Sequence, residues 1–237
     1  MMDSKYSDYI TSDMANHYVV FGGTYINKSY FKEDDNGQWE EVSYGECLMC
    51  GGRGFFCLTC SKCKAENAML ALVSVMIAQA FQNSKVFGFD IHKPSIETAI
   101  KEAKKKNLNN AQFKVADAEN YNGNFDIITF FDCLHDMGDP LGASKYAFNH
   151  LYNSGTLILI EPFASDLPED NFNTVGQMYY SFSTMGCIPT SKSQKKGLAL
   201  GAQAGPKKLF KILEDAGFIK CKIIKKNSTN MVITAEK

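Results

Sequence analysis

The stretch KVFGFDIHKPSIETAIKEAKKKNLNNAQFKVADAENYNGNFDIITFFD (85–132) decides the fold of this 237-residue chain. It contains three short apolar segments, 85–90, 111–117 and 125–132, and each ends in an aspartate. Such segments are typical of buried parallel strands. Between the first two, Pro94 opens a helical pattern with apolar residues along one face. Strands separated by a helix predict a parallel sheet with right-handed crossovers.

The same alternation continues toward the C-terminus. A helix is predicted over about 140–151, a strand at 155–162 and a further helix from Pro206 onward. The last two strand patterns, 218–224 and 229–236, are joined by a short polar turn and must therefore run antiparallel. The sequence thus predicts an α/β fold, with a doubly wound, mostly parallel, Rossmann-like sheet and a C-terminal antiparallel strand pair.

The N-terminal part has a different character. Residues 1–46 are aromatic and polar without helical periodicity, and we interpret them as a short extension that could either supply a strand or two or be only partly ordered. The main domain is then expected to span 47–237. Its central first strand is predicted at VSYGECLM (42–49), directly before a turn at Gly52 and Gly54.

Composition argues against several classes of function. The chain has 25 Lys and Arg against 26 Asp and Glu, a net charge of −1. A general binder of nucleic acid or of an anionic membrane would carry a basic excess. The longest apolar run is too short to cross a bilayer, and the first residues lack the pattern of a secretory signal. We therefore expect a cytoplasmic protein with no nucleic-acid or membrane partner.

Three acidic residues are expected to converge at one edge of the sheet. Asp90, Asp117 and Asp132 each end a predicted strand, and ligands of doubly wound sheets bind beyond the carboxyl ends of the strands. A carboxylate at Asp90 can accept both hydroxyls of a ribose, and one at Asp117 can accept the amine of adenine. The alternative for each residue alone is a helix cap or a solvated loop position.

Several motifs together carry a resemblance to a known family. They are IAQAFQNSKVFGFDIHKPSIETA (77–99), VADA (115–118), FFDCLHDMGDP (130–140), GTLILIEP (155–162) and EDNFN…GLALGAQAG (169–205). In this order they resemble class I S-adenosylmethionine-dependent methyltransferases, and in particular a microbial small-molecule subgroup. That subgroup usually carries an N-terminal winged-helix region, which is missing here. The resemblance covers about residues 72–237.

The resemblance implies S-adenosylmethionine as the cofactor. By this likeness Asp90 would bind the ribose hydroxyls, Asp117 and Ala118 would hold the adenine, and Asp132 would lie near the sulfonium. His135 belongs to an HD pair similar to the one that follows the fourth strand in O-methyltransferases of small aromatic substrates. It would act as a general base toward a substrate hydroxyl or, alternatively, would position the loop after the strand.

The glycine-rich loop of the family is altered in this chain. One registration uses CLMCGGRG (47–54), with Gly52 and Gly54 as cofactor-binding glycines and Cys50 in place of the first glycine. The other registration puts Ala71 where the last glycine belongs. Because a side chain hinders the close approach of backbone to a ligand, we expect weak or absent cofactor affinity.

An irregular cysteine-rich segment spans 47–71. We keep three interpretations of it: a zinc module, a divergent cofactor loop, and an irregular insertion in the gene model. The zinc module would use thiolates of two CxxC pairs, although the predicted methyl transfer itself requires no metal. The cysteines of the segment are Cys47, Cys50, Cys57, Cys60 and Cys63.

The long stretch 163–204 exceeds ordinary connection lengths and is interpreted as a lid over the substrate. Its apolar side chains would cover the acceptor or, alternatively, pack a helix onto the sheet. We therefore predict methyl transfer from S-adenosylmethionine to a small-molecule acceptor. The alternative is a non-catalytic binding or scaffold protein of the same fold with a degenerate cofactor loop, stabilised in one version by zinc.

Overall fold

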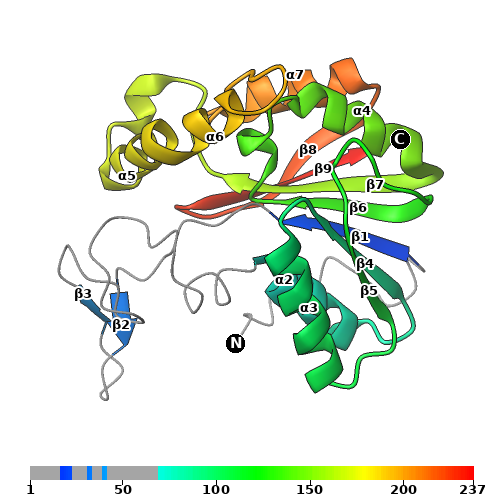
Figure 1. Cartoon of the computed structure of the whole chain (residues 1–237). Coiled ribbons are helices and arrows are strands. Elements are labelled where there is room, and N and C mark those ends of the chain that lie inside the picture. The colour runs from blue at the N-terminus through cyan, green and yellow to red at the C-terminus, as the bar shows by residue number, and fades with distance from the viewer. Residues whose placement is uncertain (1–16, 23–30, 34–38, 42–68) are drawn as a thin grey trace.

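A computed structural model describes residues 17–22, 31–33, 39–41 and 69–237. Its centre is a seven-stranded sheet in the order β5-β4-β1-β6-β7-β9-β8 (Figure 1). The strands are β1 (His17–Gly22), β4 (Lys85–Asp90), β5 (Ala111–Val115), β6 (Phe125–Phe131), β7 (Leu151–Pro162), β8 (Ile219–Lys226) and β9 (Asn230–Glu236). A separate two-stranded sheet pairs β2 (Phe31–Glu33) with β3 (Trp39–Glu41).

Helices cover both faces of the large sheet, so the molecule has three layers (Figure 1). The helices α2 (Met69–Ala80) and α3 (Lys93–Lys105) lie on one face. On the other face α4 (Pro140–His150) and α7 (Pro206–Ala216) pack against each other. This arrangement confirms the predicted doubly wound α/β fold.

Alternating side chains along the central strands build two cores. On β6, Ile127 packs toward α2 and α3, whereas Ile128 and Phe130 face the side of α4 and α7. Leu157 and Leu159 of β7 are fully buried in the same core as Ile128 and Phe130. Because successive side chains of a strand point to opposite faces, an apolar run such as FDIITFF is buried on both sides.

The C-terminal elements follow the sequence prediction closely. The helix α7 begins at Pro206 and ends at Gly217, whose φ of 108° is the left-handed conformation that favours glycine at a helix C-terminus. The strands β8 and β9 pair antiparallel, as predicted. The structure adds that β9 inserts between β7 and β8, pairing antiparallel with both.

The prediction of the central strand was wrong. The place between β4 and β6 is occupied by β1, His17–Gly22, which is parallel to both neighbours, and not by residues 42–49. The central strand therefore comes from within residues 1–46. This agrees with the prediction that this segment could supply a strand. The sequence separation explains the error, because the chain that links β1 to α2 is far longer than an ordinary connection.

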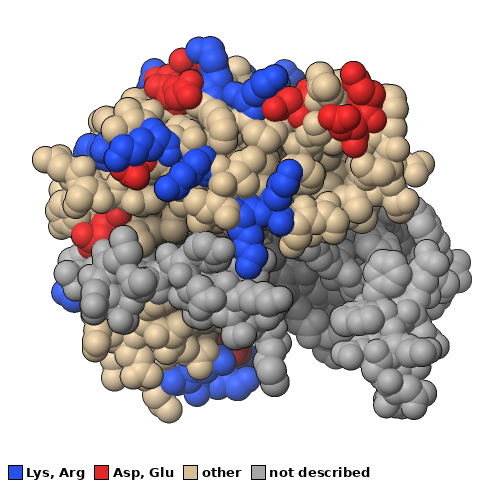
Figure 2. Space-filling view, turned by 180° about the vertical axis from the view of Figure 1, so that it is seen from behind, with Lys and Arg blue, Asp and Glu red and all other residues tan. Residues whose placement is uncertain are grey.

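Charges of both signs are distributed over the surface. On the face shown in Figure 2, Lys and Arg side chains of the described residues are mixed with Asp and Glu side chains. Among the helices of the described residues, none is both long and apolar enough to cross a membrane.

Candidate functional site

The carboxyl ends of β4 and β6 lie at the same edge of the sheet, on either side of β1. In the strand register, Phe21 of β1 is opposite both Phe89 and Phe130. Asp90 is one residue beyond Phe89, and Asp132 is two residues beyond Phe130. The two aspartates therefore lie at nearly the same height in the sheet. Two strand spacings separate the ends laterally, about 10 Å. This separation suits one nucleoside-sized ligand, as the sequence predicts.

Asp90 ends β4 with its carboxylate held by the turn that leads into α3. The backbone N–H of His92 donates a hydrogen bond to Oδ1 of Asp90 at 2.8 Å. Burial raises the pKa of Asp90, more than the hydrogen bond and charge of His92 lower it. Among the described residues, the hydrogen bond from His92 is the one seen at this carboxylate.

Asp117 lies beside Asp90 at the same edge, two residues beyond the end of β5. The backbone N–H of Ala116 donates to the carbonyl of Asp90 at 3.1 Å, which ties the two strand ends together. Oδ1 of Asp117 accepts a hydrogen bond from the backbone N–H of Glu119 at 3.0 Å, and the side chain is exposed. Ala118 is half-buried against the core next to it.

Asp132 turns the chain out of the sheet directly after β6. Its φ of 54° lies in the left-handed region, which aspartate tolerates better than most residues. Its backbone N–H still donates to the carbonyl of Ile160 at 2.7 Å, so the residue stays attached to β7. Strained backbone positions of this kind cluster at functional sites.

The turn after Asp132 carries His135 into a buried acidic environment. His135 belongs to a short 3₁₀ turn, η2 (Leu134–Asp136), and only 4% of its surface is exposed. Its Nδ1 lies 2.5 Å from Oε2 of Glu161, a residue near the end of β7 that is itself 1% exposed. The second oxygen of Glu161 accepts the backbone N–H of Leu134 at 2.9 Å. Both oxygens of one buried carboxylate thus hold this turn.

The other ring nitrogen of His135 faces an acid and a thiol. Nε2 lies 3.3 Å from Oδ1 of Asp136, and the donor atoms of His135, Asp136 and Cys187 all lie within 4.8 Å of one another. Burial alone would lower the pKa of His135, but the carboxylate of Glu161 and its other neighbours raise it well above the usual value. Burial raises the pKa of Cys187 and keeps its thiol protonated.

The predicted lid segment consists of short helices rather than irregular chain. They are η3 (Pro168–Asn171), α5 (Thr174–Phe182), a π-turn η4 (Ser183–Cys187) and α6 (Ile188–Lys192). Cys187 closes the π-turn, and such turns are frequent at functional sites. The side chains of Met178, Tyr180 and Met185 are exposed, whereas those of Tyr179 and Phe182 are half-buried. The hydroxyl of Tyr179 donates to the carbonyl of Thr229 at 2.8 Å, so part of this set does pack against the rest of the domain. Cover of an acceptor by this segment stays a prediction.

The chain that returns from α6 is fastened to the turn after β6. The side-chain amide of Gln194 accepts the N–H of Gly138 at 2.9 Å and donates to the carbonyl of Asp136 at 2.9 Å. Ser191 donates to the carbonyl of Met137 at 2.8 Å, and the N–H of Gly201 donates to the carbonyl of His135. We call residues 191–201 the clasp. The sequence analysis did not identify these contacts.

Gln203 follows the clasp with a side-chain amide that is buried and unsatisfied. Neither its Nε2 nor its Oε1 has a hydrogen-bond partner in the described part of the chain. Buried amides almost always have partners, so an exception calls for an explanation such as a ligand. The glycine-rich sequence GLALGAQAG around it was the available signal.

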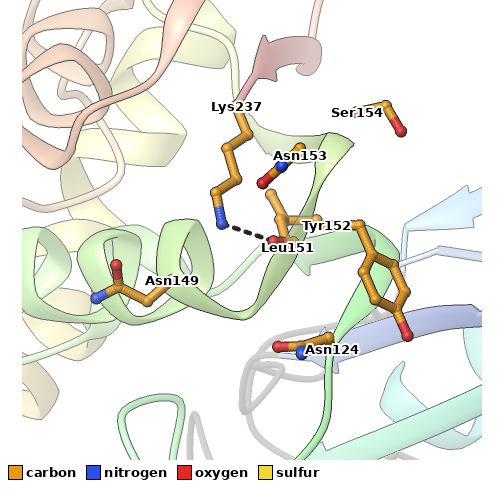
Figure 3. A pocket seen from close by; sticks show the side chains of 7 residues that line it. All are labelled: Asn124, Asn149, Leu151, Tyr152, Asn153, Ser154 and Lys237. Atoms are coloured by element: carbon orange, nitrogen blue, oxygen red, sulfur yellow. Dashed lines mark hydrogen bonds between the residues drawn. The ribbon is translucent and has the colours of Figure 1, made fainter.

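The structure leaves some predicted residues untested. Gly52 and Gly54, and the cysteine-rich segment up to residue 68, lie outside the described residues. The strand at 42–49 on which the glycine assignment depended is replaced by β1. A cavity of about 500 Å³ lies at the start of β7, lined by residues such as Asn124, Tyr152 and Lys237 (Figure 3). It is at the opposite edge of the sheet from Asp90 and is not part of the candidate site.

Comparisons with known proteins identify the family and the fold. A family model described as "Methyltransferase domain" matches residues 70–217. Solved structures of similar fold include an O-methyltransferase family protein from Burkholderia thailandensis, with a TM-score of 0.60 at 10% identity over 99% of this chain and 56% of that chain. PigF with SAH has a TM-score of 0.61 at 11% identity, covering 98% of this chain and 53% of PigF.

A third similar structure is human N-acetylserotonin methyltransferase in complex with SAM. It has a TM-score of 0.54 at 17% identity and covers 71% of this chain and 45% of that chain. No curated protein matches the sequence significantly. The chain spans about half the length of the solved structures that it resembles.

Proposed function

Because the chain belongs to the methyltransferase domain family, we propose that it transfers a methyl group from S-adenosylmethionine to a small-molecule acceptor. One observation carries the proposal. The carboxyl ends of β4 and β6 flank the central strand at one level of the sheet, which brings Asp90 and Asp132 to a single edge. Ligands of doubly wound sheets bind at this edge.

The residues at the edge suit the nucleoside part of the cofactor. The N–H of His92 fixes Oδ1 of Asp90, and the carboxylate held in this way would accept the ribose hydroxyls. Asp117 is held by the N–H of Glu119 and stays exposed, and with Ala118 it would hold the adenine. Hydrogen bonds to a charged acceptor contribute about 1.5–3 kcal/mol each.

Because β1 is the central strand, the backbone expected to approach the cofactor closely is the one at the end of β1. Gly22 is the last residue of β1 and lies opposite Phe131 of β6. We infer that Gly22, rather than Gly52 or Gly54, allows the backbone to approach the amino-acid part of the cofactor, since glycine has no side chain in the way. This proposal replaces Gly52 and Gly54 with Gly22 as the glycine at the cofactor.

Bound S-adenosylmethionine supplies an electrophilic methyl group on a sulfonium. The chain contributes orientation and exclusion of water, which account for much of the rate in a direct displacement. Asp132 would place a negative charge near the cationic centre. The role of His135 as general base stays a prediction. Nδ1 is engaged by Glu161, and the raised pKa of the ring keeps a proton on Nε2, which opposes its action as a base.

Binding and turnover test the proposal separately. Calorimetry with S-adenosylmethionine and S-adenosylhomocysteine should show binding that the D90A variant loses. Transfer of a labelled methyl group to a panel of hydroxylated aromatic and aliphatic compounds should then reveal an acceptor. Cofactor binding without transfer to any compound would favour the non-catalytic alternative. A folded chain that binds neither ligand would refute both the cofactor and the reaction.

A further inference from the structure

A second possible site lies beside the proposed cofactor edge, where three side chains of different chemistry meet. His135 and Asp136 come from the turn after β6, and Cys187 comes from the π-turn in the lid segment. Their donor atoms, one nitrogen, one oxygen and one sulfur, all lie within 4.8 Å of one another. His135 and Cys187 are 4% and 5% exposed, so this is not a solvated group of surface residues.

Cys187 interacts with both His135 and Asp136, and the distance between the latter two side chains is compatible with metal ligation. Nε2 of His135 and Oδ1 of Asp136 are 3.3 Å apart, which is longer than a good N–H···O hydrogen bond. Two ligands about 2.0–2.1 Å from a tetrahedral metal lie about 3.3–3.4 Å from each other. Oδ1 of Asp136 is also buried without a hydrogen bond of ordinary geometry among the described residues.

Glu161 supplies the outer support that metal-bound histidines usually have. Its carboxylate accepts a hydrogen bond from Nδ1 of His135 at 2.5 Å, which fixes the ring and directs Nε2 at Asp136 and Cys187. A carboxylate behind a histidine ligand raises the basicity of the ring and is a recurring part of zinc sites. The same Glu161 anchors the backbone of Leu134, so the support is rigid.

We propose that His135 Nε2, Asp136 Oδ1 and Cys187 Sγ form a zinc site, with Glu161 as its outer-shell carboxylate. Zinc prefers this mixture of imidazole, thiolate and carboxylate ligands. Binding displaces two protons, one from the His135 ring and one from the Cys187 thiol, so a divalent ion leaves the net charge of the cluster unchanged. Three protein ligands leave the fourth position to water or to a hydroxyl or thiol ligand.

The role of that fourth position rests on the proposed function. The turn that holds His135 and Asp136 begins two residues after Asp132, at the edge where the acceptor is expected. An acceptor oxygen or sulfur on zinc would lose its proton to solvent more readily, because the metal stabilises the anion. His135 would then act as a ligand and not as a base. The existence of the site does not depend on methyl transfer.

The test starts from a variant in which the cysteine-rich segment cannot bind metal. In the full chain with Cys47, Cys50, Cys57, Cys60 and Cys63 replaced by serine, competition with a chromophoric chelator measures zinc stoichiometry and affinity. We expect one zinc per chain. In the same background C187S should weaken binding at least tenfold, whereas C221A, a matched change at a half-buried thiol of β8, should leave binding unchanged.

Two further measurements identify the ligands. Cobalt(II) substituted for zinc should show a thiolate charge-transfer band that C187S removes and C221A retains. E161Q should keep the stoichiometry but lower the affinity about 10–100-fold, as expected for an outer-shell partner. Circular dichroism melting establishes that each variant is folded. Absence of zinc binding by the folded background chain, or an affinity that C187S does not change, would overturn the proposal.

Discussion

Nδ1 of His135 and Oε2 of Glu161 lie 2.5 Å apart in the interior, and this contact joins the turn after β6 to the end of β7. Both side chains are almost fully buried. Since Asp132 and Asp136 stand on either side of His135 in the chain, the contact also fixes the geometry of the edge where the cofactor and the acceptor are expected to meet.

Breaking this pair should destabilise the fold strongly. Removing one partner of a buried charge pair leaves the other charge uncompensated, which costs about 3–5 kcal/mol. We expect E161Q and H135N each to lower the free energy of unfolding in chelator-treated protein by several kcal/mol. Urea denaturation of the two single variants and the double variant should give a coupling energy of about 1–3 kcal/mol. Additive effects of the two substitutions would show that the contact is not made.

Gln203 should limit the stability of the free protein. Its buried amide has no partner among the described residues, and such a group carries a desolvation penalty of about 1–3 kcal/mol. We therefore expect Q203L, which keeps a similar volume, to raise the free energy of unfolding and to lower kcat/KM for methyl transfer. The control is Q112L at an exposed position of β5, which should change neither by much. A loss of stability in Q203L would indicate that the amide is already satisfied.

Most of the fold was predictable because it depends on local patterns. Segments such as KVFGFD and FDIITFF are apolar on both faces, and Pro206 and Gly217 mark the two ends of a helix. The central strand was not predictable in the same way. HYVVFG (17–22) has the aromatic and β-branched residues of a strand, but its local sequence does not indicate that it pairs with residues more than sixty positions away.

The site was predictable only in part, for a related reason. An aspartate that ends an apolar segment is visible in the sequence, so Asp90 and Asp132 could be predicted as site residues. The contact of His135 with Glu161 depends on the pairing of β6 with β7, and that with Cys187 depends on the fold of the lid segment. The one available signal was a glutamate inside an apolar strand, GTLILIEP, since a buried acid needs a partner.

Cofactor affinity should depend on the ionisation of Asp90. Only the carboxylate accepts both ribose hydroxyls, and burial raises the pKa of Asp90 above its ordinary value. Affinity should therefore stay constant near neutral pH and fall as the pH decreases through the raised pKa, earlier than for an ordinary aspartate. Calorimetry with S-adenosylhomocysteine from neutral pH down to about pH 5 measures this effect.

The D90N variant is the control for that titration. It should bind S-adenosylhomocysteine more weakly at neutral pH by about 1.5–3 kcal/mol, because it loses a charged acceptor. Its affinity should also lack the dependence on pH that the unmodified chain shows over the same range. Identical profiles for the two proteins would remove Asp90 from the cofactor site.

Replacing Gln194 with alanine should remove two hydrogen bonds between the clasp and the turn after β6. Its Oε1 accepts the N–H of Gly138, and its Nε2 donates to the carbonyl of Asp136. In Q194A the amide of Gly138 should therefore exchange with solvent faster, because the side-chain acceptor that it has among the described residues is gone. Hydrogen exchange followed by mass spectrometry or NMR measures this change. Since Gln194 is exposed, we expect a loss of only about 1–2 kcal/mol in the free energy of unfolding.

The Q194E variant separates the two hydrogen bonds of Gln194. Glutamate keeps an oxygen that can accept the N–H of Gly138 but has no N–H for the carbonyl of Asp136. Protection of Gly138 should thus persist in Q194E and disappear in Q194A. If the clasp also positions Asp136 and His135, both variants should raise KM for the acceptor, Q194A more than Q194E. Unchanged exchange at Gly138 in Q194A would mean that Ser191, Gly201 and the other clasp contacts hold the turn without Gln194.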